Sequence, residues 1–220
     1  MELSSIQNIT SSDLGKIMGE GSYGKVYEYE KDKVYKKFGY DLVADECGIH
    51  KSVINEIAQL YFISSLDCDI APDVYDYHIS LEYQIGIIME KYDTSLWDMK
   101  VRLSANDIAF ISRQLFTKLY ILLKNGLYHG DIKPANVVMN KKTKQIRFID
   151  WGLSHVKESH VIDHISDFLD YTEMFSDPST ILYKKIGKKL DYAKCDIWST
   201  GVTIIHLICR YMHKKYPFED

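Results

Sequence analysis

Two short polar motifs constrain this chain more than any other feature. Residues 129–136 read His-Gly-Asp-Ile-Lys-Pro-Ala-Asn, and residues 149–152, which begin thirteen residues after the first motif ends, read Ile-Asp-Trp-Gly. The apolar residues around them predict short strands that deliver the polar side chains to one cleft. Phosphoryl transfer requires positioning and charge neutralisation from a protein rather than covalent work. The two motifs therefore predict a phosphoryl-transfer site.

Each polar residue of these motifs can take one task in that chemistry. Asp131 can accept the proton of an attacking hydroxyl, and Lys133, two residues on, can neutralise the γ-phosphate. Asn136 and Asp150 supply oxygen ligands, and a hard Mg²⁺ ion needs only a few of these beside phosphates and water. The expected cofactors are ATP and Mg²⁺.

At these residues the chain resembles the eukaryotic-type protein kinases, whose catalytic loop reads His-Arg-Asp-Leu-x-x-x-x-Asn and whose metal-binding turn reads Asp-Phe-Gly. The resemblance covers nearly all of the chain. It implies an α+β, two-lobed fold, with a small strand-rich lobe at residues 1–91 and a mainly helical lobe at residues 92–220 that lacks the last helices of the family. It also implies transfer of the γ-phosphate of ATP to serine or threonine hydroxyls of proteins, for which Lys133 is typical.

Two departures from the family pattern concern regulation. Gly130 stands where the family has an arginine that pairs with a phosphate on the activation segment. Trp151 replaces the phenylalanine of the metal-binding turn and keeps an aromatic wedge that can pack beneath the regulatory helix. The catalytic residues are kept, whereas one regulatory cation is lost.

Two other functions remain open at this point. His-Gly-Asp and Ile-Asp-Trp also occur in small-molecule phosphotransferases that resemble aminoglycoside and choline kinases. The Lys133-Pro134 step and the stretch at 196–201, which reads Asp-Ile-Trp-Ser-Thr-Gly, favour the protein kinases instead. A catalytically weak, kinase-like binding scaffold is the third reading.

A glycine-rich run near the amino terminus predicts a lid over ATP. Glycine lets backbone N–H groups approach phosphate oxygens without a Cβ in the way. The residues after the run alternate as a hairpin, with Lys31-Asp32 as the turn. The expected cofactor contacts in this run are Gly19, Gly21, Ser22, Tyr23, Gly24 and Val26.

The next strand, Lys33 to Phe38, should carry the lysine that holds the α- and β-phosphates. Side chains alternate faces along a strand, so Lys36 shares a face with Val34, which suits adenine, and Lys37 shares one with the bulkier Tyr35. We expect Lys36 to be the phosphate-binding residue. Its expected partner is Glu56, within a helix at residues 52–65.

A buried strand at residues 85–89 leads into the segment expected to bind the adenine edge. There, backbone groups of Glu90 and Tyr92 are the expected contacts, and the resemblance adds Val138 to the adenine site. The segment Ser95 to Trp97 is expected to be helical.

Two longer helices and a threonine complete the second lobe. Ser104 resembles a helix cap before a helix at 106–123, and a second helix is expected at 196–212. Thr172 falls where the family's threonine touches the catalytic aspartate and lysine. Because the chain stops soon afterwards, we expect the apolar face of that second helix to favour self-association or a partner protein. Its exposed residues would be Ile197, Ile204, Ile205 and Ile208.

Composition limits the partners without selecting the function. A formal net charge of −4 and a pI near 6.1 give no reason to expect nucleic-acid binding. No apolar run is long enough to predict a membrane span, and four cysteines without a paired motif favour free thiols in a reducing compartment. Abundant Ile, Lys, Tyr and Asp suggest a large DNA virus. The expected location is cytoplasmic, in the host cytoplasm or the virion if the protein is viral.

Overall fold

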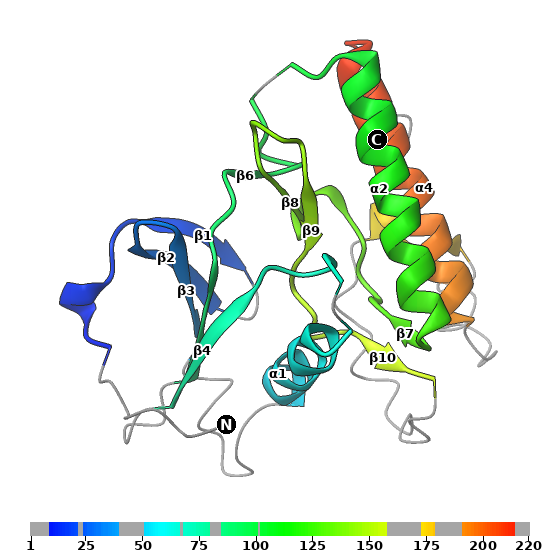
Figure 1. Ribbon diagram of the computed structural model, residues 1–220. Helices are drawn as coiled ribbons and strands as arrows, with labels where there is room; N and C mark the ends of the chain where they lie inside the picture. The colour runs from blue at the N-terminus through cyan, green and yellow to red at the C-terminus, as the bar shows by residue number, and fades with distance from the viewer. Residues whose placement is uncertain are drawn as a thin grey trace. The chain divides into compact units, whose positions relative to one another are not determined.

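The computed structural model describes residues 9–21, 24–39, 51–66, 68–79, 85–100, 102–157, 173–178 and 191–213. The chain divides into two compact units, Met1–Lys91 and Tyr92–Asp220 (Figure 1), which are described separately below. None of the described helices is both long and apolar enough to cross a membrane.

The first unit is a five-stranded antiparallel sheet with one long helix. The strands follow the order β1-β2-β3-β5-β4, so sequence neighbours pair except where β5 lies between β3 and β4. Figure 1 shows the strands in blue to green and the helix in cyan. The elements are η1 (Ser11–Asp13), β1 (Ile17–Gly21), β2 (Gly24–Glu30), β3 (Lys33–Phe38), α1 (Lys51–Ser64), β4 (Val74–Ile79) and β5 (Ile85–Glu90).

Strand β3 has buried side chains on both of its faces, because the neighbouring residues Val34 and Tyr35 are both buried. Tyr35 is buried and its hydroxyl lies 2.9 Å from His78 Nδ1 on β4. Its ring occupies the space that a side chain on Gly86 of β5 would need. A residue larger than glycine at position 86 would therefore displace the Tyr35 ring from the sheet.

In its described residues, the second unit combines two long helices with small sheets. Helices α2 and α4 run side by side (Figure 1), and β6, β8 and β9 form one three-stranded sheet, while β7 pairs with β10. The elements are β6 (Thr94–Ser95), α2 (Ala105–Lys124), β7 (Leu127–Tyr128), η3 (Pro134–Asn136), β8 (Val137–Met139), β9 (Ile146–Phe148), β10 (His155–Val156), η5 (Glu173–Phe175) and α4 (Tyr192–Tyr211).

The expected cap of α2 is confirmed. The Ser104 hydroxyl accepts a hydrogen bond from Asp107 N at 3.1 Å, and the Asp107 carboxylate accepts one from Ser104 N at 2.9 Å. This reciprocal arrangement satisfies two N–H groups at the start of the helix. At the other end, Gly126 has a φ of +67°, a left-handed conformation that glycine adopts without strain and that ends the helix.

Two sequence expectations about helices are wrong. The segment Ser95 to Trp97 is not helical, because Ser95 pairs with Val138 in β6–β8 and a turn follows. The second long helix begins at Tyr192 rather than Asp196, since Asp191 caps it by accepting a hydrogen bond from Lys194 N at 3.2 Å. Asp196 therefore lies inside the helix and not at its start.

The apolar face expected on α4 is largely present. Ile197, Ile205 and Ile208 are exposed, and Ile204 is half-buried. Residues on the opposite side of the helix, including Val202 and Leu207, belong to the core.

Candidate active site

A buried carboxylate of α4 holds the start of the catalytic loop. Asp196 Oδ2 accepts a hydrogen bond from His129 N at 2.7 Å, and its Oδ1 accepts one from Gly130 N at 2.9 Å. Burial raises the pKa of Asp196 to about 7, while these two donors act in the opposite direction. The sequence did not reveal this role, because the expected helix began at Asp196, where an acidic residue is ordinary.

His129 joins the two polar motifs. Its Nδ1 accepts the Asp131 N–H at 3.3 Å, so Nε2 carries the ring proton and donates it to Ile149 O at 3.1 Å. Burial lowers the pKa of His129 to about 4, so the ring is neutral at neutral pH. It therefore serves as a positioning group that fixes Asp131 relative to the residue before Asp150.

Asp131 lies between two partners from its own loop. Lys133 Nζ is 2.7 Å from Asp131 Oδ2, and Asn136 Nδ2 donates to the same oxygen at 2.9 Å. Burial raises the pKa of Asp131 to about 6, although Lys133 and Asn136 both oppose that shift. A carboxylate with a pKa near neutrality and a fixed orientation suits a general base.

The predicted metal ligands have the oxygen chemistry that Mg²⁺ prefers. Asn136 uses its amide nitrogen for both the carbonyl and the carboxylate of Asp131, so its amide oxygen is the atom that could bind a metal ion. Ile149, the residue before Asp150, donates its N–H to Asn136 O at 3.0 Å. Asp150 itself has a φ of +67°, which turns the chain at that residue. One amide and one carboxylate, with phosphates and water, fit a Mg²⁺ site.

Trp151 is fully buried within the second unit. Its ring centroid lies 4.5 Å from that of His129 and 6.4 Å from that of Phe148, and its Nε1 donates to Phe148 O at 3.3 Å. The aromatic side chain at this position thus packs on His129, the positioning histidine of its own unit. Through these ring contacts, Trp151 supports the catalytic loop at His129.

Gly130 has a structural reason to be glycine. Its φ is +80°, and a Cβ at this position would lie 2.5 Å from Leu153 O. An arginine here would strain the backbone and displace that carbonyl. The departure from the family pattern is therefore built into the local backbone.

In the first unit, Lys36 and Glu56 form the expected pair. Lys36 Nζ donates to both carboxylate oxygens of Glu56, at 2.6 and 2.7 Å, and their side chains are 11% and 2% exposed. The choice of Lys36 over Lys37 is confirmed for this pairing. Their roles in catalysis remain predictions.

The glycines of the β1–β2 hairpin differ in what requires them. A Cβ on Gly19 or Gly21 would meet nothing within 4 Å, so packing does not demand glycine there. Gly24 has a φ of +145°, and a Cβ would run into Lys37 O of β3. Gly24 therefore serves sheet pairing, whereas Gly19 and Gly21 fit close approach by a phosphate. Ser22, Tyr23 and Thr172 lie outside the described residues.

The expected adenine contacts lie on strands or next to them in each unit. In the first, Val26 is half-buried on β2 and Val34 is buried on β3, opposite Met89 of β5. Glu90 N already donates to Asp73 O at 2.8 Å, so any adenine contact of Glu90 would use its carbonyl.

In the second unit, Val138 is half-buried on β8. The ring of Tyr92 lies under the guanidinium of Arg147, 5.8 Å from its centroid.

The comparisons with known proteins agree with this geometry. A family model described as the protein kinase domain matches residues 12–219. A probable casein kinase II subunit alpha homolog of Encephalitozoon cuniculi is 28% identical over 91% of this chain, and CBL-interacting serine/threonine-protein kinase 20 of Arabidopsis thaliana is 26% identical over all of it. The chain spans 58% and 49% of these relatives.

A solved structure shares the fold. It is a crystal structure of the yeast RNA Pol II CTD kinase CTDK-1 complex, with a TM-score of 0.67 and 20% identity, covering 91% of this chain and 63% of the other. With the family match over almost the whole sequence, and with the catalytic loop and metal-binding turn in place, the chain belongs to the protein kinase domain family.

Proposed function

We propose that this protein is a kinase that transfers the γ-phosphate of ATP to serine or threonine hydroxyls of protein substrates. The observation that carries the proposal is the arrangement around Asp131, whose carboxylate is held by Lys133 and Asn136 and has a pKa raised to about 6. The relatives named above as serine/threonine-protein kinases support the acceptor class.

Each residue has one role in the proposed reaction. Asp131 takes the proton of the acceptor hydroxyl, and Lys133 neutralises charge on the transferred group. Asn136 and Asp150 would hold Mg²⁺, which supplies charge neutralisation at the phosphates when bound. Lys36, oriented by Glu56, holds the α- and β-phosphates.

The test is phosphoryl transfer from labelled ATP with Mg²⁺ to a panel of proteins and small alcohols. We expect label on protein serine and threonine, and none on the alcohols. Label on an aminoglycoside or choline alone would support the small-molecule alternative. ATP binding without transfer to any acceptor would support the binding scaffold.

We also propose that the exposed isoleucines of α4 promote self-association or binding of a partner protein. Contiguous apolar exposure favours association, and Ile197, Ile205 and Ile208 are exposed on one helix. Light scattering over a concentration series tests this. A stable monomer of 25.6 kDa at all concentrations would contradict self-association.

A further inference from the structure

The carboxyl end of α4 carries an arginine whose guanidinium is bonded entirely to backbone. Arg210 Nη1 donates to Leu96 O at 3.2 Å and to Trp97 O at 2.7 Å, and Nη2 donates to Met99 O at 2.5 Å. Three carbonyls of one turn thus share one cation. Hydrogen bonds to a charged group are the stronger kind, and the planar fork fixes their directions.

The same turn is bonded on its other side to the catalytic loop. Leu96 N donates to Val137 O at 2.8 Å, and Trp97 N donates to Pro134 O at 3.1 Å. The segment 96–99 therefore lies between Arg210 and the part of the loop that contains Asn136. Moving this turn would move the loop, because two backbone hydrogen bonds join them.

Arg210 and Asp196 lie on nearly the same face of α4. They are fourteen residues apart, which is close to four turns of a helix and about 21 Å along its axis. Asp196 holds the first residues of the loop directly, at His129 and Gly130. One helix is thus connected to both ends of the catalytic segment, directly through Asp196 and through the turn at 96–99 in the case of Arg210.

We infer that Arg210 is a positioning residue for the catalytic loop, acting through the turn at 96–99. The expected effect on kcat rests on the proposed kinase function. The expected effect on the position of the turn does not depend on activity. Loss of the guanidinium leaves three carbonyls without their donor and frees the turn to shift. A displacement of about 1 Å in catalytic groups is enough to lower turnover by up to about 10²-fold.

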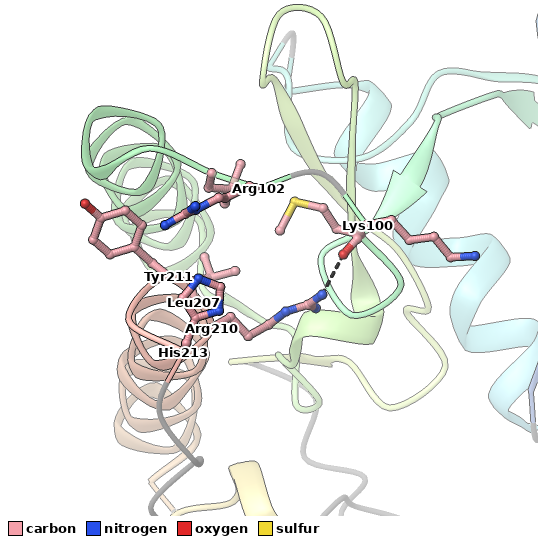
Figure 2. A pocket seen from close by; sticks show the side chains of 8 residues that line it. Lys100, Arg102, Leu207, Arg210, Tyr211 and His213 are labelled. Atoms are coloured by element: carbon pink, nitrogen blue, oxygen red, sulfur yellow. Dashed lines mark hydrogen bonds between the residues drawn. The ribbon is translucent and has the colours of Figure 1, made fainter.

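A cavity of about 290 Å³ adjoins Arg210, and it makes a sharp test possible. Figure 2 shows the Arg210 side chain reaching from α4 toward the segment that carries Lys100, with Arg102 and Tyr211 also lining the cavity. Truncating Arg210 to alanine would enlarge this space. A small guanidinium ion could then enter and bind the same carbonyls.

The experiment compares Arg210→Ala with Arg102→Ala, a matched control that removes an exposed arginine from the same cavity. We expect Arg210→Ala to lower kcat by roughly 10-fold to 10²-fold and to speed amide hydrogen exchange at Leu96 and Trp97, with Arg102→Ala close to wild type in both. Ethylguanidinium should restore part of both effects, whereas ethylammonium, which lacks the fork, should not.

Other outcomes separate the two proposals. Equal behaviour of the two alanine variants in exchange and kcat would overturn the positioning role. If the wild-type protein shows no transfer but Arg210→Ala still speeds exchange at the turn, the kinase proposal fails and the structural role stands. Should Arg210→Ala not fold, Arg210→Lys decides: we expect faster exchange at the turn than in wild type, and wild-type exchange would contradict the inference.

Discussion

The two units hold their polar side chains in different ways. In the second, a continuous set of hydrogen bonds runs from Asp196 through His129 to Asp131 and on to Asn136. In the first, one ion pair between Lys36 and Glu56 joins a strand to a helix, and the β1 residues are exposed. The groups proposed for proton transfer are thus linked by a series of hydrogen bonds within one unit, whereas the proposed phosphate-binding lysine is paired with a carboxylate on another element.

Replacing Asp131 by Asn should have the largest effect, because it removes the proton acceptor while keeping the shape of the side chain. We expect kcat to fall at least ~10²-fold, the scale for a positioned base. Asp150→Ala should cause a similar loss by removing the metal carboxylate. Steady-state kinetics with Asp73→Asn, an exposed aspartate, as control would check both. Near-normal transfer by Asp131→Asn would show that the role is assigned to the wrong residue.

Lys36→Met should have the next largest effect and Lys37→Met a much smaller one. Losing a charge-assisted bond to phosphate of about 2 kcal/mol corresponds to roughly a 30-fold loss in kcat/KM. Because Lys36→Met also removes the cation that contacts the buried Glu56 carboxylate, the free energy of unfolding should drop by about 3 kcal/mol.

Thermal unfolding recorded on both lysine variants separates lost stability from lost catalysis. Double replacement, Lys36→Met with Glu56→Leu, should recover stability without activity. A larger kinetic loss in Lys37→Met than in Lys36→Met would contradict the assignment drawn from strand alternation.

The sequence predicted features that depend on local rules. The bounds of β3, the Ser104 cap and the choice of Lys36 followed from side-chain alternation and capping chemistry, which need only neighbouring residues. The family resemblance supplied the roles of the motif residues, including Asp131 and Asp150.

Features that depend on distant partners were missed. The helix expected at Ser95 is a strand because Ser95 pairs with Val138. Asp196 contacts His129, which is 67 positions away in the sequence. Arg210 contacts Leu96, which is 114 positions away. Local periodicity cannot reveal either contact.

The pKa of Asp131 gives a smaller, pH-dependent effect. Burial raises it to about 6 from an ordinary value of 3.8, so the base is protonated below pH 6 and available above it. The profile of kcat/KM against pH should therefore rise tenfold per unit up to about pH 6 and then level off. His129 should not change the profile near pH 6, since burial lowers its pKa to about 4 and the ring is already neutral at that pH. An acid limb centred near pH 4 would contradict the burial-driven shift.

The smallest expected effect is that of phosphatase treatment. Gly130 offers no guanidinium to a phosphate between Leu153 and Thr172, so removing phosphates from that segment should change kcat by less than about twofold, within the range of weak surface electrostatics. Protein made in bacteria, with and without phosphatase, provides the comparison. A tenfold loss on treatment would show that another cation has taken over the role.

The left-handed backbone at Gly130 has an evolutionary consequence. Because the Leu153 carbonyl fills the space where a side chain would begin, no single codon change can return an arginine to this position without disturbing the loop beside Asp131. A change that moves the Leu153 carbonyl would have to accompany it. A lineage that acquires this loop therefore has a one-way path away from control by activation-segment phosphate, and new control would have to arise elsewhere in the chain.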